Sequence, residues 1–380
     1  MAYYVLHPNT QINFTFNRLL TYGDQAGRLE EIKEIAYRFK DFNSWFIEWT
    51  ALAQKCEREG RYLNAAYAYR MAEFLVKDGL PHKEESYRKF KENFYRSFKE
   101  GEIEKFTVPY EGKTLPVIRS KANPEKGVIL VHGGYDSFME EFYLTLRDIV
   151  TRYGYTIIMF EGPGQGQALR DGFKMTHEWE KPVKAILDFL DLKDVALMGI
   201  SLGGYLAPRA AAFEPRIKQV ISHNICYDFI DGLIRWMPPL LNRIFRFLFF
   251  LRAGWVINML IGVLMKKNMG LRWLVEHGMF ILGAKTPYEY YRLLSRYTIR
   301  GIAHLVKQDV LLLAGEKDHF MPIDHYKKMK DALINARTVK GRIFTESEGG
   351  EQHCQVGNHY IAIEEIIRWL DTFYDKKRVA

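Results

Sequence analysis

The segment GISLGG at residues 199–204 places a serine, Ser201, in the pattern G-x-S-x-G. An apolar run precedes the segment and a helical pattern follows it, so we expect the serine on a sharp turn between a strand and a helix. Such a turn presents the hydroxyl above a sheet, and its glycines leave room for nearby backbone. We therefore predict that Ser201 is a nucleophile, with an ordinary serine in a glycine-rich turn as the alternative.

A serine hydroxyl attacks only when a base takes its proton. His353 follows the last expected strand, and Asp318 follows the strand before it. Both would lie at the same sheet edge as Ser201, in the chain order nucleophile, acid, base. We predict that His353 is the general base and that Asp318 orients its imidazole and stabilises the imidazolium.

Neighbouring residues offer alternatives for these two roles. Glu316 lies closer to the end of its strand than Asp318, and Asp324 is better placed to cap the next helix. The alternative bases are His319, His325 and His359. We interpret Cys354, beside His353, as a packed thiol rather than a second nucleophile.

The oxyanion formed during attack requires two backbone N–H donors. We expect one from Leu202 and the other from the segment HGGYDS at residues 132–137, where Gly134 is favoured and Tyr135 is the alternative. His132 is interpreted as bracing this loop by hydrogen bonds. A further glycine-rich stretch at 161–166 lacks the spacing of a phosphate-binding loop, and we interpret it as a tight turn at the rim of the site.

These residues require a sheet to position them. Short apolar segments alternate with helical ones after residue 104, which predicts a parallel sheet covered on both faces. Strands are expected at Lys105–Tyr110, Thr114–Ser120, Val128–His132, Thr156–Phe160, Val195–Ile200, Gln219–His223, Val310–Leu313 and Arg342–Thr345.

The chain before this sheet is predicted to be a helical cap domain, residues 1–104. Helical patterns run through residues 25–101, where Asn43 or Ser44 could cap a helix that ends at Gly60. A tetratricopeptide-like pair is the alternative, but such repeats need about three copies to be stable.

A second helical segment, residues 231–302, interrupts the alternation and divides the sheet domain into 105–230 and 303–380. An insertion at this point is expected to form a lid over the carboxyl ends of the strands, where open sheets bind ligands. Its many aromatic residues predict a bulky, hydrophobic small-molecule substrate. The residues expected to contact it are Tyr135, Asp231 and Trp236.

Charge and composition restrict the partners. The formal net charge is +8, and residues 231–275 hold seven basic residues and one acidic residue. Their apolar neighbours argue against a nucleic-acid partner. The longest uncharged run there, residues 253–265, is too short for a membrane span of about 20 residues. We expect the apolar lid to form a homodimer, with attachment to a membrane surface as the alternative.

The N-terminus and the cysteines indicate the compartment. The first residues, MAYYVLHPNT, lack a basic segment followed by an apolar run, so no secretory signal is expected. The odd number of cysteines, three, favours reduced thiols in a cytoplasmic protein. No cysteine pair has metal-ligand spacing, and we predict neither a metal site nor a cofactor.

Five motifs together resemble those of α/β-hydrolases with an N-terminal helical cap. They are HGGYDS (132–137), FEGPGQG (160–166), GISLGG (199–204), GEKD (315–318) and GGEQHCQVGN (349–358). That group includes a carbon–carbon bond hydrolase of 2,6-dihydroxypseudooxynicotine, fungal polyketide-shortening hydrolases and fermentation–respiration esterases. The resemblance implies the α/β-hydrolase fold, a mostly parallel eight-stranded sheet with a helical cap domain and a helical lid insertion, and it implies a triad of Ser201, Asp318 and His353.

The function expected from these features is hydrolysis of a bulky, largely apolar ester or activated ketone through an acyl-enzyme on Ser201. Carbon–carbon bond hydrolysis of the β-diketone or polyketide type is the main alternative. In the resembling carbon–carbon hydrolase an acidic residue outside the triad assists cleavage; here Asp228 and Asp231 follow Ser201, but neither is the glutamate expected from the family, and either could cap the first lid helix. The remaining alternatives are a non-catalytic binding protein and a serine peptidase.

Overall fold

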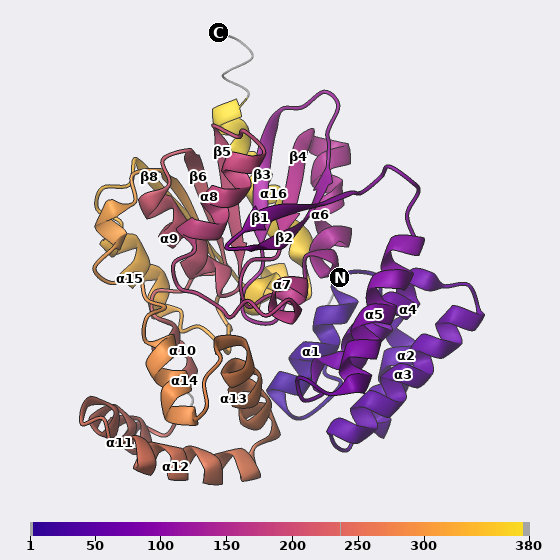
Figure 1. The fold of residues 1–380 in the computed structure, drawn as a ribbon, viewed down its shortest axis with the longest axis vertical. Coiled ribbons are helices and arrows are strands. Elements are labelled where there is room, and N and C mark those ends of the chain that lie inside the picture. Colours follow the sequence, from indigo (N-terminus) through magenta and orange to yellow (C-terminus); the bar gives the residue numbers. More distant parts are fainter. Residues whose placement is uncertain (1–2, 236, 375–380) are drawn as a thin grey trace.

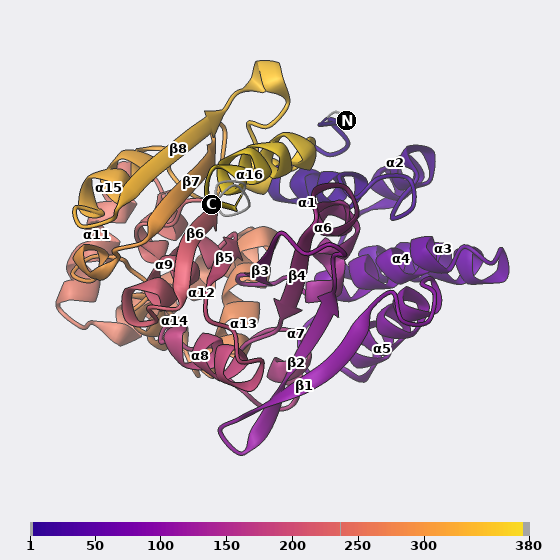
Figure 2. The same ribbon diagram turned by 90° about the horizontal axis from the view of Figure 1, so that it is seen from above.

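The computed structural model describes residues 3–235 and 237–374. At its centre is one sheet of eight strands in the order β1-β2-β4-β3-β5-β6-β7-β8 (Figures 1 and 2). The strands are β1 (Glu104–Tyr110), β2 (Lys113–Ser120), β3 (Gly127–His132), β4 (Tyr155–Phe160), β5 (Val195–Ile200), β6 (Ile217–His223), β7 (Asp309–Gly315) and β8 (Thr338–Phe344).

Strand β2 runs antiparallel to both of its neighbours, β1 and β4, and every pair from β4 to β8 is parallel. This confirms the predicted α/β-hydrolase fold with a mostly parallel eight-stranded sheet. The central strands β4, β5 and β7 are buried along their whole length, because helices cover both faces of the sheet. The edge strand β8 begins at Thr338 rather than at Arg342, since the exposed Lys340 and the half-buried Arg342 interrupt the apolar pattern that marks the other strands.

Two sets of helices cover the sheet. Helices α6 (Met139–Tyr153) and α16 (His359–Tyr374) pack on one face, in the same core as the N-terminal helices. Helices α8 (Glu180–Phe189), α9 (Gly203–Phe213) and α15 (Asp324–Ala332) pack on the other face, in the same core as the lid. The short α7 (Gly166–Arg170) follows the glycine-rich stretch after β4.

The N-terminal segment contains five helices: α1 (Thr10–Leu20), α2 (Leu29–Arg38), α3 (Phe42–Arg58), α4 (Tyr62–Phe74) and α5 (Pro81–Arg96). Helix α1 lies before the region that the sequence predicted as helical. The predicted cap of α3 was wrong, because the N-cap is Asp41, whose carboxylate accepts a hydrogen bond from the Ser44 N–H. Ser44 instead holds the third helical position, and its hydroxyl oxygen accepts a hydrogen bond from the Asp41 backbone N–H, as in a capping box.

The lid contains α10 (Phe229–Ile234), α11 (Pro239–Phe250), α12 (Gly254–Lys267), α13 (Met269–Leu282) and α14 (Pro287–Leu294). Figure 1 shows the lid and the N-terminal helices side by side below the sheet. The indole N–H of Trp273 on α13 joins the two by donating to the Phe74 carbonyl at 2.8 Å. None of the described helices is long and apolar enough to cross a membrane.

Candidate active site

Ser201 lies on the sharp turn between β5 and α9. Its φ of +64° is unusual for a residue with a side chain, which is characteristic of a strained functional turn. A Cβ on Gly199 would lie 2.1 Å from the Gly203 carbonyl oxygen, and one on Gly204 would lie 1.6 Å from that of Asn224. The two glycines are therefore required for the turn to close.

The structure brings Ser201, His353 and Asp318 into one hydrogen-bonded chain. The Ser201 hydroxyl oxygen is 2.9 Å from His353 Nε2, and His353 Nδ1 is 2.7 Å from Asp318 Oδ2. The other Asp318 oxygen accepts the backbone N–H groups of Phe320, at 2.7 Å, and Met321, at 3.0 Å. These bonds fix the carboxylate so that the imidazole can donate from Nδ1 and keep Nε2 free to accept the serine proton.

His353 and Asp318 each shift the pKa of the other. Burial alone would lower the pKa of His353, but the Asp318 carboxylate outweighs it and raises that pKa well above its usual range. Burial likewise opposes ionisation of Asp318, yet the attraction of His353 and its hydrogen bonds lower the pKa of Asp318. Asn224, which follows β6 and which the sequence analysis did not single out, also donates its side-chain N–H to Asp318.

The alternative acids and bases lie in other surroundings. Glu316 is exposed and accepts the Glu346 backbone N–H, and Asp324 forms a surface ion pair with Lys328. His325 is 3.4 Å from Asp231 and not at the serine. His319 lies next to Asp318 in the chain, with its ring nitrogen 3.3 Å from the Gln11 side-chain oxygen.

His359 and Cys354 line the same pocket as Ser201. Burial lowers the pKa of His359 to about 3, so this histidine is neutral near pH 7. The Cys354 thiol points to the His223 carbonyl at 3.5 Å. Within the described ranges, no group of three or more histidine, cysteine, aspartate and glutamate side chains is arranged to hold a metal ion.

The loop after β3 packs against the nucleophile turn. A Cβ on Gly134 would lie 2.6 Å from the Leu202 backbone nitrogen, so the loop and the turn are in close backbone contact. The Gly134 N–H, the favoured second donor, donates to the Ser137 hydroxyl at 3.2 Å. His132 braces the loop, with Nδ1 2.8 Å from the Gly133 carbonyl oxygen.

Gln165, which the sequence analysis did not single out, holds the peptide between Gly134 and Tyr135. Its side-chain N–H donates to the Gly134 carbonyl at 2.9 Å, and its side-chain oxygen accepts the Gly162 N–H at 3.1 Å. In a planar trans peptide the C=O and N–H point in opposite directions. The bond from Gln165 therefore turns the Tyr135 N–H away from Gln165 and fixes its direction.

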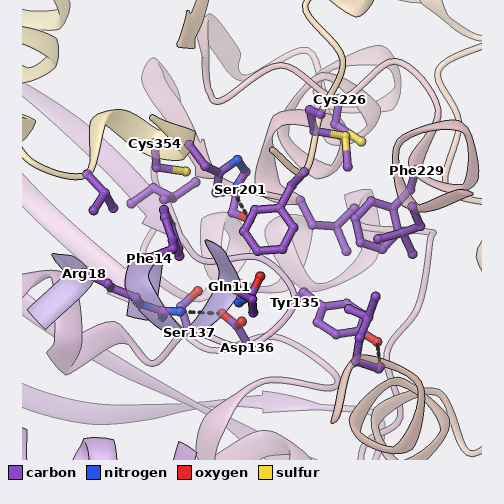
Figure 3. Close-up of a pocket in the computed structure, with 18 of the residues that line it drawn as sticks. Gln11, Phe14, Arg18, Tyr135, Asp136, Ser137, Ser201, Cys226, Phe229 and Cys354 are labelled. Carbon is purple, nitrogen blue, oxygen red and sulfur yellow. Dashed lines mark hydrogen bonds and ion pairs between the residues drawn. The ribbon is translucent and has the colours of Figure 1, made fainter. Parts of the chain in front are cut away.

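Ser201 opens into a pocket of about 820 Å³, including its mouth, between the N-terminal helices and the lid. Figure 3 shows Phe14 and Arg18, from α1, on one side of Ser201 and Tyr135 and Phe229 on the other. Other apolar lining residues are Phe142, Leu233, Trp273, Leu274, Phe320 and Met321. The unpredicted helix α1 thus forms one wall of the pocket.

A buried ion network fixes α1 to the core beside this pocket. Arg18 lies 2.5 Å from one Glu141 oxygen and 3.0 Å from an Asp136 oxygen. Arg70, on α4, bonds the other Glu141 oxygen at 3.0 Å. Burial alone would raise the pKa of Asp136, but the charges of Arg18 and Arg70 lower it. Asp136, which lines the pocket, is therefore a carboxylate at neutral pH.

Of the two predicted substrate contacts that the structure describes, Tyr135 lines this pocket and Asp231 does not. The Tyr135 hydroxyl donates to the Leu274 carbonyl at 2.7 Å, which ties the β3 loop to the lid. The prediction for Asp231 is corrected, since this carboxylate faces a surface hollow and pairs with Arg246 and His325. Asp228 caps α10 by accepting the Asp231 N–H at 3.1 Å. Trp236 lies outside the described residues.

The fold and this geometry agree with the comparison to known families. The chain matches the alpha/beta hydrolase family over residues 128–347, more than half of its length. It therefore belongs to the alpha/beta hydrolase family, and the resemblance predicted from the motifs is confirmed.

Several curated fungal proteins match nearly the whole chain. They include hydrolase acrC of Aspergillus aculeatus, 28% identical over 89% of this chain and 90% of the relative. The 20-hydroxy-prefusarin hydrolase FUS2 of Gibberella moniliformis is also 28% identical, over 96% of this chain and 97% of the relative.

Two solved structures share the fold over almost all of the chain. The 2,6-dihydroxy-pseudo-oxynicotine hydrolase superposes with a TM-score of 0.70 at 18% identity, over 94% of this chain and 95% of the neighbour. AbyA5 superposes with a TM-score of 0.67 at 17% identity, over 92% of this chain and 90% of the neighbour. At these identities the likeness shows the fold alone.

Proposed function

We propose that this chain is a serine hydrolase that cleaves bulky, largely apolar esters through an acyl-enzyme on Ser201. The observation that carries the proposal is the hydrogen-bonded chain from Ser201 through His353 to Asp318, at the base of an apolar pocket. The full-length relatives are named hydrolases, which supports the same reaction class here.

The mechanism follows from the direction of these bonds. His353 Nε2 accepts the Ser201 proton while the serine oxygen attacks the ester carbonyl carbon. The carbonyl oxygen becomes an oxyanion held by the N–H groups of Leu202 and Tyr135. The intermediate collapses, the C–O bond breaks, and His353 returns the proton to the leaving alcohol. Water, deprotonated by His353, then releases the acid from Ser201.

Carbon–carbon hydrolysis is the second candidate, because a half-buried acidic residue, Asp136, lines the pocket. Cleaving a β-diketone expels a carbanion that must receive a proton on carbon. Asp136 has its pKa lowered by Arg18 and Arg70, so it is ionised and is a poor proton donor near pH 7. The ionised state of Asp136 therefore favours an ester over a β-diketone as the substrate.

A substrate comparison tests the proposal. We expect the protein to hydrolyse p-nitrophenyl 4-phenylbutyrate faster than p-nitrophenyl acetate, and both faster than 1-phenyl-1,3-butanedione. Ser201→Ala should lower kcat at least about 10³-fold, whereas Ser295→Ala, at an exposed serine at the end of α14, should not change it. Preference for the diketone would replace the ester proposal with the second candidate. Equal activity of the Ser201→Ala and wild-type proteins would refute both.

A further inference from the structure

The outer side of the lid exposes a continuous set of apolar side chains, which we call the lid face. On α11 and its C-cap the exposed residues Leu240, Ile244, Phe247 and Leu251 recur every three or four positions, and on α12 Trp255, Met259 and Val263 recur every four. This spacing places each set on one side of its helix. Phe247, Phe250 and Trp255 are 62%, 81% and 76% exposed.

The orientation of both helices is fixed from the other side. Phe245 on α11 and Ile257 and Ile261 on α12 are buried in the core that the lid shares with the sheet. Figure 1 shows the two helices along the edge of the molecule opposite the C-terminus. The lid face is therefore a surface that the folded chain itself leaves uncovered, and large exposed apolar patches mark interaction sites.

The charged side chains that α11, α12 and their flanking residues contribute are basic, while two carboxylates, Asp231 and Asp324, line the hollow beside Leu240 and Arg243. Residues 232–275 contain no acidic side chain. Arg246 pairs with Asp231, and Arg272 pairs with Glu276. Within the part of the chain that the structure describes, four further cations have no ion-pair partner: Arg243, Arg252, Lys266 and Lys267.

We propose that the lid face binds the surface of an anionic lipid bilayer, with α11 and α12 lying flat in the headgroup region. Apolar and aromatic side chains that alternate with lysine and arginine are typical of helices at this interface. The helices have 12 and 14 residues, which is too short to span. Each unpaired cation would meet an anionic headgroup.

A second copy of the chain fits the lid face less well. Pairing two identical faces would bring both sets of unpaired cations together without an acidic partner, and like charges at an interface are unfavourable. A bilayer supplies the opposite charge and an apolar layer at the same time. The charge pattern therefore selects the lipid surface over the homodimer that the apolar lid alone predicted.

Co-sedimentation with vesicles tests this proposal, using the full-length protein. The probes are phosphatidylcholine vesicles, with and without about 30 mol % phosphatidylserine. We expect strong binding only to the anionic vesicles and release at high salt. Lys266→Gln/Lys267→Gln should lower the partition coefficient by roughly 25-fold, at about fivefold per cation, whereas Lys99→Gln/Lys330→Gln, at exposed lysines outside the lid, should not.

The apolar contribution is tested with Phe247→Ser/Trp255→Ser, which should abolish binding. Its matched control is Phe189→Ser/Ile334→Ser, at exposed apolar residues elsewhere. Thermal unfolding checks that all variants fold. Absence of binding to anionic vesicles would overturn the proposal, as would equal binding by the lid and control variants. A concentration-dependent dimer that only Phe247→Ser/Trp255→Ser dissociates, without vesicle binding, would assign the lid face to self-association instead. Ester hydrolysis in solution is a separate readout, so failure here leaves the proposed reaction standing.

Discussion

Replacing Gln165 by methionine should weaken the oxyanion site without touching the triad. The side chain is buried, and it bonds the Gly134 carbonyl at 2.9 Å and the Gly162 N–H at 3.1 Å. Methionine has nearly the same volume but can make neither bond. The peptide between Gly134 and Tyr135 then loses the contact that sets the direction of the Tyr135 N–H.

The expected fall in kcat depends on which contacts around the oxyanion site remain in Gln165→Met. Removing an oxyanion donor outright costs about 10²–10³-fold in kcat. Gln165→Met keeps the Leu202 donor, and the close contact between Gly134 and the Leu202 backbone still restrains the loop. We therefore expect kcat to fall about 10- to 100-fold, while KM changes less than about twofold because ground-state binding is unaffected.

Steady-state hydrolysis of p-nitrophenyl 4-phenylbutyrate gives both constants. Gln167→Met is the matched control, since Gln167 lies two residues further on, in α7, and its side-chain N–H donates to Asp171 at 2.8 Å. The rate of labelling by a fluorophosphonate, whose phosphoryl oxygen occupies the oxyanion site, should fall by the same factor as kcat. An unchanged kcat in Gln165→Met, or an equal loss in the control, would refute this account of the loop.

The remaining predictions concern the acid and the ion network. Asp318→Asn should lower kcat about 10⁴-fold by favouring the wrong imidazole tautomer. Because the Asp318 carboxylate raises the pKa of His353 above 6.5, and only the neutral imidazole is a base, wild-type kcat/KM should rise with pH through a midpoint above 6.5. Asp318→Asn should lower the pH of that midpoint. The same midpoint can be read from the pH dependence of fluorophosphonate labelling of Ser201, and a midpoint equal to that of the wild type would contradict this prediction. In urea unfolding, Arg18→Met should destabilise the fold by more than about 1 kcal/mol but by less than the roughly 3–5 kcal/mol expected for a buried charge left unpaired, because Arg70 still pairs with Glu141. Arg38→Met at an exposed pair should cost less than about 1 kcal/mol, and equal losses would show that the network does not fix α1.

The sequence predicted the sheet and the hydrogen-bonded chain well for a physical reason. Buried parallel strands are uninterrupted apolar runs, and the carboxyl ends of such strands meet at one edge. Ser201, Asp318 and His353 each follow such a run, so their proximity could be inferred from order alone. The edge strand β8 carries charges on its exposed side, and its start was accordingly misplaced.

Helix α1 could not be predicted in the same way. It is buried on nearly all sides, including Asn13 and Asn17, so polar side chains that a surface helix would expose lie in its packed interior. Those asparagines are satisfied by backbone groups near the N-terminus: the Asn17 side-chain oxygen accepts the Tyr4 N–H at 2.7 Å and that of Asn13 the Leu6 N–H at 2.7 Å. Such long-range bonds leave no local pattern in the sequence.

The roles of Asp231 and Gln165 also depend on contacts between segments that are distant in the sequence. Asp231 was expected at the substrate because it opens the lid, but its distance from the pocket depends on how α10 folds back toward α15. Gln165 sits in a glycine-rich stretch that was predicted only as a turn. Its role could be found only when the loops after β3 and β4 were brought together by the pairing of those strands.

The hydrogen-bonded chain implies that Ser201 is an activated nucleophile. Intact mass spectrometry after treatment with a fluorophosphonate, on the wild-type protein and on Ser201→Ala, tests this directly. We expect a single adduct on the wild type, mapped by peptide digestion to Ser201, and none on the variant. An unmodified wild-type protein that is fully folded, or an adduct that persists in Ser201→Ala, would contradict it.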